Sequence, residues 1–237
     1  MYVIAEIGIN HGGNMSLAQD MIAAAKTAGA DVVKFQLYDS EILLKDTEFL
    51  DQVRPCDLSR EQYNDLAGFA RSLDIQCSAS TFDLERLEWL KATSPPFYKI
   101  GGRAFKDVKL VEATLESGLT YISLGMADEK LVKRYAKHPN ARFLSCKSQY
   151  PAVYEASDLD RAFQDKKQLK ERWSGVSCHE AGIGYALFMA AHGAKVIEKH
   201  FTTSRELSGV DMASSIEPTE LRQLCSIAPE LEKYSTM

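Results

Sequence analysis

Strand-like and helix-like segments alternate along the whole 237-residue chain, and this alternation restricts the fold more than any other feature. The expected strands are short apolar runs with polar residues at their carboxyl ends. They cover residues 2–8, 31–36, 75–78, 97–100, 120–123, 142–146, 174–177 and 195–198. The expected helices cover residues 16–28, 59–73, 84–92, 106–117, 129–138, 159–171, 182–192 and 218–231.

Signals at the helix ends support this division. Ser16 and Ser59 each precede a glutamine three positions later, which is the pattern of a capping box at a helix start. Gly29, Gly118 and Gly193 follow expected helix ends, where the backbone often needs a left-handed residue. The segments around these glycines all run from helix through glycine to strand.

Eight strands in strict alternation with eight helices predict a parallel sheet, because parallel strands need crossover connections. Eight such units close naturally into a (β/α)8 TIM barrel of the α/β class, and we expect residues 1–237 to form one such domain. The alternative is an open doubly wound sheet, but no GxGxxG motif follows the first strand. Residues 37–58 form the longest segment expected to be irregular, and such loops are often functional.

The composition excludes several classes of protein. The chain has 28 Lys and Arg against 33 Asp and Glu, so its net charge is 28 − 33 = −5, a poor match for a nucleic acid backbone. Its five cysteines are widely spaced without a CxxC pair, which is typical of reduced thiols in a cytoplasmic protein. The start of the sequence has no signal-peptide pattern, and its most apolar stretch is too short to cross a membrane.

Polar side chains gather at the carboxyl ends of the expected strands, where (β/α)8 barrels carry their active sites. Side chains two positions apart on a strand share a face, so the inward-pointing set can be deduced. It comprises Glu6, Asn10, His11, Lys34, Gln36, Lys99, Ser123, Cys146, Ser148, Tyr150, Ser177, His179, Glu198 and His200. Two lysines and several hydroxyls would suit a ligand that has both a carboxylate and a phosphate.

His179 and His200 end neighbouring expected strands, so their imidazoles could bind one metal ion and leave positions free for substrate. Two hydrogen-bonded loop histidines are the alternative. Lys34 and Lys99 could be structural partners of Glu6 and Glu198. Either lysine could instead be the Schiff-base lysine of a class I aldolase, because burial can make an amine nucleophilic.

Several motifs, in order along the chain, resemble the sialic acid synthase (N-acetylneuraminate synthase) family. The resemblance extends over essentially the whole chain, and the segment ending Glu-Lys-His-Phe-Thr is its most specific part. The motifs are IAEIGINH at 4–11, DVVKFQ at 31–36, YKI at 98–100, GM at 125–126, YP at 150–151, GAKVIEKHFT at 193–202 and IEP at 216–218.

The resemblance implies a barrel enzyme that condenses phosphoenolpyruvate with the aldehyde of an N-acetylmannosamine-like sugar to give a 2-keto-3-deoxy acid and phosphate. It implies catalytic roles for Glu6, Lys34 and Glu198, and a divalent metal, most often Mn²⁺, on His179 and His200. The substrate-binding residues that it implies are Asn10, Gln36, Ser80, Lys99, Arg103, Ser123, Ser148, Tyr150, Ser177 and Asp211.

The sequence departs from the family pattern near the sugar site. Gly102 replaces a serine after the Lys-Ile motif, Glu180 follows His179 in place of threonine, and Met212 follows Asp211 in place of histidine. Family members usually continue into a small antifreeze-like domain, which we expect this chain to lack. We expect a homodimer, and the rival from another class is a non-catalytic subunit that assists a partner enzyme.

Overall fold

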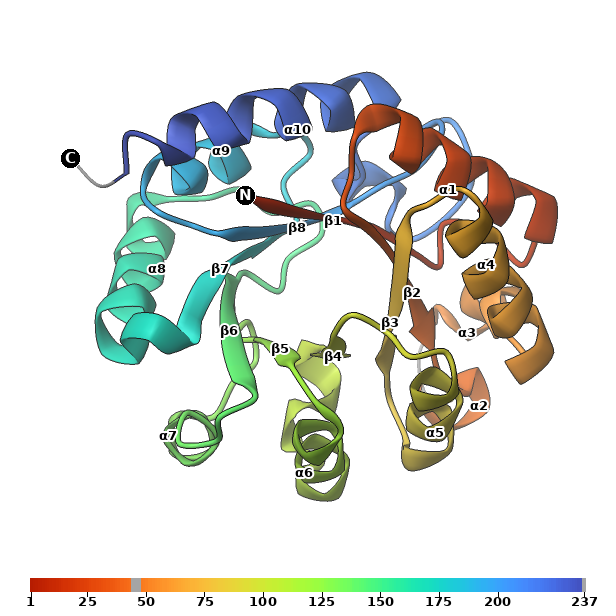
Figure 1. Ribbon diagram of the computed structural model, residues 1–237, viewed down its shortest axis with the longest axis horizontal. Coiled ribbons are helices and arrows are strands. Elements are labelled where there is room, and N and C mark those ends of the chain that lie inside the picture. Colours follow the sequence, from red (N-terminus) through yellow and green to blue (C-terminus); the bar gives the residue numbers. More distant parts are fainter. Residues whose placement is uncertain (44–47, 236–237) are drawn as a thin grey trace.

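The computed structural model describes residues 1–43 and 48–235. Its eight strands form one closed parallel barrel in sequence order (Figure 1). The (β/α)8 prediction is therefore confirmed, and the alternative of an open sheet is wrong. The strands are β1 (Tyr2–Gly8), β2 (Val32–Leu37), β3 (Gln76–Thr81), β4 (Tyr98–Ile100), β5 (Thr120–Ser123), β6 (Ala141–Cys146), β7 (Trp173–Cys178) and β8 (Val196–His200).

Helices cover the outside of the barrel, as the ring of coiled ribbons in Figure 1 shows. They are α1 (Met15–Ala28), α4 (Arg60–Ser72), α5 (Leu84–Ala92), α6 (Val108–Ser117), α7 (Glu129–Tyr135), α8 (Ala156–Leu169), α9 (Gly184–Ala191) and α10 (Pro218–Glu232). Their buried faces pack on the outward side chains of the strands in one apolar layer. None of the described helices is long and apolar enough to cross a membrane.

Two details of the local predictions are wrong. The helix α1 is capped by Asn14, whose side chain accepts a hydrogen bond from the backbone N–H of Leu17, so the box expected at Ser16 does not form. The segment expected to be irregular after β2 contains α2 (Ser40–Leu43) and α3 (Leu50–Val53); residues 44–47 lie outside the described part. The Asp57 carboxylate accepts hydrogen bonds from the backbone and hydroxyl of Ser40, which closes this segment on itself.

Other helix ends agree with the sequence. Ser59 forms the expected capping box with Gln62 at the start of α4, because each side chain binds the other residue's backbone N–H. Gly29 ends α1 with φ of +96°, a left-handed conformation that glycine adopts without strain. Both signals act on backbone groups only a few residues away, so they can be recognised from the sequence alone.

Apolar and polar side chains fill different levels of the barrel interior. Near the amino ends of the strands, an apolar plug closes the barrel; it consists of Ile4, Val32, Phe97, Tyr121, Leu144 and Val196. Two positions further along these strands stand Glu6, Lys34, Lys99, Ser123, Cys146 and Glu198. The alternation of side chains along each strand produces both levels from the same strands.

Gly175 allows β7 to approach β8 closely at the level of the plug. A Cβ atom at this position would lie 1.9 Å from the carbonyl oxygen of Val196, and the φ of +154° is itself unusual for an L-residue. The two strands pair in parallel from Gly175 opposite Val196 to Cys178 opposite Lys199. Because His179 and His200 follow directly on this pairing, β7 and β8 bring their imidazoles together.

Candidate active site

Four buried charged side chains form a chain of ion pairs across the barrel. The Lys34 Nζ lies 2.7 Å from Glu6 Oε2 and 3.5 Å from Glu198 Oε2. The Lys99 Nζ lies 3.5 Å from the other oxygen of Glu198. All four residues are at most 5 % exposed, so the Glu198 carboxylate is held between two ammonium groups out of contact with bulk water.

Each of three predicted serines binds one of these charged groups. The Lys34 Nζ donates to Ser80 Oγ at 2.9 Å, and the Lys99 Nζ donates to Ser123 Oγ at 2.8 Å. Ser177 Oγ donates to Glu198 Oε1 at 2.8 Å. These hydroxyls fix the directions of the charged side chains. Strand register places Ser177 directly opposite Glu198, and it places Ser80 two positions beyond Ser78, which is the register partner of Lys34.

Burial and pairing separate the pKa values of the four groups. Burial dominates at Glu6 and raises the pKa of its carboxyl, whereas at Glu198 the two lysines outweigh burial and lower the pKa. Burial dominates at Lys99 and lowers the pKa of its ammonium, while Glu198 and Glu6 outweigh burial at Lys34 and raise the pKa there. Two carboxyls with opposite shifts can serve as a proton donor and a proton acceptor.

The imidazoles of His179 and His200 face one another at the ends of β7 and β8, with ring centroids 5.5 Å apart. His179 Nδ1 lies 2.7 Å from the carbonyl oxygen of Lys147, which leaves its Nε2 free as an acceptor. His200 Nδ1 is buried and has no hydrogen-bond partner in the described part of the chain. Tyr150 packs against both rings, with centroids 4.1 Å and 5.9 Å away.

These two histidines fit a divalent cation. Burial lowers the pKa of His179 to about 4 and holds that of His200 well below its usual value, so both rings are neutral and can donate a lone pair. The carbonyl of Lys147 orients the His179 ring as a metal-bound histidine requires. No group of three or more His, Cys, Asp or Glu side chains placed to hold a metal exists within residues 1–43 and 48–235, so water or substrate would complete the coordination.

The acidic groups next to the histidines occupy different places. The Glu180 carboxylate accepts hydrogen bonds from the backbone N–H groups of Tyr185 and Ala186 at the start of α9, at 2.8 and 3.0 Å, so it caps that helix. Asp211 lies beside His200, with Oδ2 3.8 Å from Nδ1. Burial raises the pKa of Asp211 to about 6, against an opposing effect of Arg103.

The other predicted substrate-binding residues lie in different surroundings from one another. Gln36 donates to Glu6 Oε1 at 3.2 Å, beside Gly8. Ser148 and Arg103 are exposed beyond the strand ends. Asn10 uses its side-chain N–H groups internally, on the carbonyl oxygen of Phe201 at 2.9 Å and on Ser215 Oγ at 2.8 Å. The amide of Asn10 therefore ties the loop after β1 to the loop after β8.

Sequence reasoning missed two features of the site. One is the carbonyl oxygen of Lys147, which orients His179. The other is the pair of cations Lys199 and Arg205, which bind carbonyl oxygens of neighbouring loops. The carbonyl gives no signal in the sequence, because every residue has one. The alternation along β8 does place Lys199 outside the barrel, and a lysine that is completely buried is a signal that needs an explanation.

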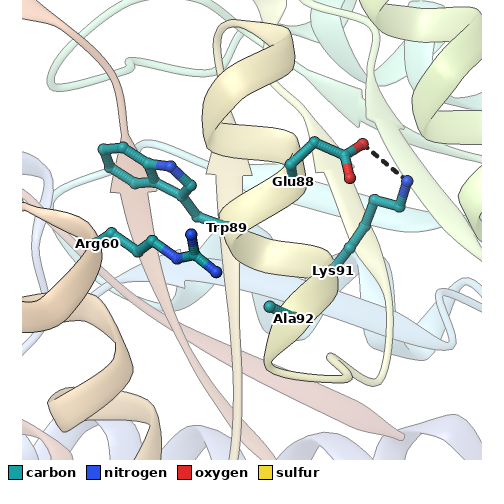
Figure 2. A pocket seen from close by; sticks show the side chains of 5 residues that line it. All are labelled: Arg60, Glu88, Trp89, Lys91 and Ala92. Carbon is teal, nitrogen blue, oxygen red and sulfur yellow. Dashed lines mark hydrogen bonds and ion pairs between the residues drawn. The ribbon is translucent and has the colours of Figure 1, made fainter.

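Two surface cavities lie away from these groups. One of about 440 Å³ is lined by Arg60 at the start of α4 and by Glu88, Trp89, Lys91 and Ala92 of α5. Figure 2 shows the Arg60 side chain extending toward Trp89 and the ion pair between Glu88 and Lys91, which is 2.8 Å long. Because these cations and carboxylates are surface groups open to solvent, we place the chemistry at the strand ends, where the charges are buried.

The fold places the chain in the (β/α)8 class, whose enzymes carry their sites at the strand ends, where this chain buries its Lys, Glu and His cluster. The chain belongs to the NeuB family, whose sequence profile matches residues 21–236. The N-acetylneuraminate-9-phosphate synthase of Mus musculus is 32 % identical, over 94 % of this chain and 68 % of that protein. The N,N'-diacetyllegionaminic acid synthase of Campylobacter jejuni is 31 % identical, over 98 % of this chain and 76 % of that protein.

Solved structures agree. The N-acetylneuraminic acid synthetase from Leptospira borgpetersenii matches 98 % of this chain and 84 % of that chain with a TM-score of 0.90 and 30 % identity. The truncated 3-deoxy-D-arabino-heptulosonate 7-phosphate synthase from Thermotoga maritima matches with a TM-score of 0.70 but only 12 % identity, which shows a shared fold alone. The resemblance to the sialic acid synthase family is thus confirmed for the family and for the kind of enzyme.

Proposed function

We propose that this chain condenses phosphoenolpyruvate with the aldehyde of an N-acetylmannosamine-like sugar to give a 2-keto-3-deoxy acid and phosphate. The observation that carries the proposal is the Glu198 carboxylate held between the buried ammonium groups of Lys34 and Lys99. When Glu6, whose pKa is raised by burial, takes up a proton, two cations face one carboxylate. The site then attracts a small ligand with several negative charges, as phosphoenolpyruvate is.

The side chains present can serve each step. Carbon 3 of phosphoenolpyruvate forms the new bond to the aldehyde carbon, water adds at carbon 2, and the bond from carbon 2 to the phosphate oxygen breaks. Glu198, which its lowered pKa keeps ionised, can orient the attacking water by accepting a hydrogen bond from it, and Lys34 and Lys99 stabilise the charge on carboxylate and phosphate. The serines that bind these groups hold them in place in advance.

A divalent ion, most often Mn²⁺ in this family, is part of the proposal. His179 and His200 would hold it, and it would supply a Lewis acid for the aldehyde carbonyl. Their neutral rings and the orphaned Nδ1 of His200 support this assignment. Asp211, beside His200 at the mouth of the site, is our candidate contact to the sugar. The names of the relatives support an acid sugar as the product.

The test is phosphate release from phosphoenolpyruvate with a panel of N-acetylated and unmodified aldoses, with Mn²⁺ and with EDTA. We expect release with at least one N-acetylated aldose, loss of release in EDTA, and loss in Lys99→Met. Lys195→Met is the control, since Lys195 is a lysine just before the amino end of β8, away from the charged groups at the strand ends, and binds Glu232 on the surface. Absence of release with every aldose, while Mn²⁺ binds, would refute the synthase proposal.

A class I aldolase is the second candidate, and one observation favours it. Burial lowers the pKa of the Lys99 ammonium, which would make the neutral amine more accessible, whereas Lys34 is held charged by Glu198 and Glu6. Borohydride treatment with pyruvate would attach a stable adduct to Lys99 if this activity exists. We expect no adduct by mass spectrometry, because Ser123 and Glu198 both stabilise the ammonium form.

The homodimer also stays a prediction, which sedimentation velocity can check.

A further inference from the structure

The two loops that follow β7 and β8 carry the proposed metal ligands. Glu180 and Ala181 come directly after His179 in the first loop. In the second loop, the backbone of Ile216 is paired with the end of β8: its N–H donates to the carbonyl oxygen of His200 at 2.8 Å, and its carbonyl oxygen accepts from Thr202 at 3.0 Å. Ser214 and Ser215, which precede Ile216, are therefore fixed relative to His200.

Lys199 joins these two loops. It precedes His200 on β8, but its side chain points out of the barrel and is completely buried. Its Nζ donates to the carbonyl oxygen of Ser214 at 2.9 Å and to that of Glu180. One ammonium group thus binds the residue after His179 and a residue of the loop that is paired with His200.

Arg205 repeats this connection one residue further along both loops. Its Nη1 lies 3.4 Å from the carbonyl oxygen of Ala181 and 3.5 Å from that of Ser215. The same group also binds the Glu220 carboxylate, at 2.9 Å to the nearer oxygen, so the guanidinium is anchored to α10. Two consecutive carbonyl oxygens of one loop are in this way bound to two consecutive carbonyl oxygens of the other.

We infer that Lys199 and Arg205, together with these four carbonyl oxygens, form a clamp that sets the distance between the imidazoles of His179 and His200. Both cations are positioning residues for the divalent ion, and the inference rests on the function proposed above. A packing role alone would not require a buried ammonium group, because burying a charge costs free energy unless the charge is used. A shorter or neutral side chain at residue 199 would free the loop after β7 to move away from β8.

The experiment measures Mn²⁺ affinity directly, by calorimetry and by the electron paramagnetic resonance of free Mn²⁺, on folded protein without substrate. We expect Lys199→Met and Arg205→Met each to weaken Mn²⁺ binding, on the order of tenfold for Lys199→Met, as loss of groups that orient metal ligands does. Lys199→Arg should restore part of the affinity, because it keeps the donors. Lys195→Met, on the opposite end of β8, should bind Mn²⁺ like the parent chain.

The double variant is the sharper test. If both cations hold one distance, Lys199→Met with Arg205→Met will weaken Mn²⁺ binding by less than the product of the single effects. The KM for phosphoenolpyruvate should stay nearly constant, since Lys34 and Lys99 are untouched. If circular dichroism shows that Lys199→Met does not fold, the Mn²⁺ affinity of Arg205→Met becomes the test, because Arg205 is partly exposed and its replacement should disturb folding less. Unchanged Mn²⁺ affinity in the folded variants would overturn the clamp alone, whereas a parent chain that binds no Mn²⁺ would overturn both the clamp and the proposed metal.

Discussion

The two levels of the barrel interior are built by the same strands and differ completely in chemistry. At the amino ends, the apolar plug includes Ile4, Val32 and Val196. Two residues further along β1, β2 and β8 stand Glu6, Lys34 and Glu198. A strand rises about 3.3 Å per residue, so only some 6 to 7 Å separates a hydrophobic layer from a network of ions.

The comparison teaches that the two levels contribute differently to the protein. Burial of the plug residues stabilises the fold directly, by roughly 25 cal/mol per Å² of apolar surface removed from water. A buried ion pair of the kind formed by Lys34 and Glu6 contributes little net stability, because the desolvation of both charges offsets their attraction. The charged level is therefore best explained by its chemistry, and the plug by its stability.

Removal of the central cation should have the largest effect. Lys34→Met leaves Glu6 and Glu198 buried without their shared partner, so we expect the free energy of unfolding to fall by about 4 kcal/mol. Phosphate release should fall at least a thousandfold. Urea unfolding and the phosphate assay measure the two effects separately.

The double variant Lys34→Met with Glu6→Gln is the control for this prediction. It removes the carboxylate that has lost its only cation among the described residues, whereas Glu198 still has Lys99, so it should recover much of the lost stability and none of the phosphate release. Recovery of both stability and phosphate release would mean that Lys34 serves only to neutralise Glu6. The charged level would then not be explained by its chemistry.

Truncation in the plug should have the opposite profile. Leu144 is completely buried on β6, so Leu144→Ala should lower the free energy of unfolding by about 3 kcal/mol through a lost contact surface and a cavity. Mn²⁺ affinity and the turnover of the folded fraction should remain close to those of the parent chain. A loss of turnover larger than tenfold at a temperature where the variant is folded would show that the two levels are not independent.

The imidazole of His11 is buried without an ion-pair partner among the described residues, so the stability of the protein should depend on pH through this group. Burial lowers its pKa from 6.5 to about 4, so between these values the unfolded chain binds a proton that the folded chain excludes. Stability contributed by neutral His11 is thus present above pH 6.5 and is lost as the pH falls toward 4. At pH 5 the loss is about 2 kcal/mol.

The variant His11→Gln should remove this pH dependence. Urea unfolding at pH 7 and at pH 5 should show a decrease in stability that is about 2 kcal/mol smaller for His11→Gln than for the parent chain. Equal decreases in the two proteins would show that His11 becomes protonated in the folded state at ordinary pH.

The smallest effect is expected at Glu180, whose side chain caps α9. Glu180→Ala should lower the free energy of unfolding by about 1 kcal/mol, because the N–H groups of Tyr185 and Ala186 lose their acceptor. Mn²⁺ affinity should be unchanged, since the clamp uses the carbonyl of residue 180 and not its carboxylate. A tenfold loss of Mn²⁺ affinity would instead assign the carboxylate to the metal site.

Much of the fold could be predicted from the sequence because its signals are local. Each strand is a short apolar run with polar residues at its end, and the period of two placed Glu6, Lys34 and Glu198 on the inner face. The cap of α1 was assigned wrongly because Asn14 and Ser16 are both good capping residues and only the backbone path decides between them. The short helices α2 and α3 have too few residues to show a period.

The candidate site could be predicted only as a set of residues. The role of Asn10 in substrate binding stays a prediction, but the sequence gives no sign that its amide nitrogen binds Phe201 and Ser215, which lie about 200 positions away. The partner of His179 is a backbone carbonyl oxygen, which no side-chain pattern can reveal. Strand alternation identifies which groups share the interior, but their pairing depends on the register between strands.

The plug also has a kinetic consequence. Because apolar side chains fill the barrel at the amino ends of its strands, ligands enter and leave through the opening at the other end. Lys99 lies on β4, whereas His200 ends β8 one pleat beyond Glu198. Under the proposed function, a reactant held by Lys99 would therefore lie beneath one held near His200. The deeper reactant would then have to arrive first, and its release would wait for the departure of the one above it.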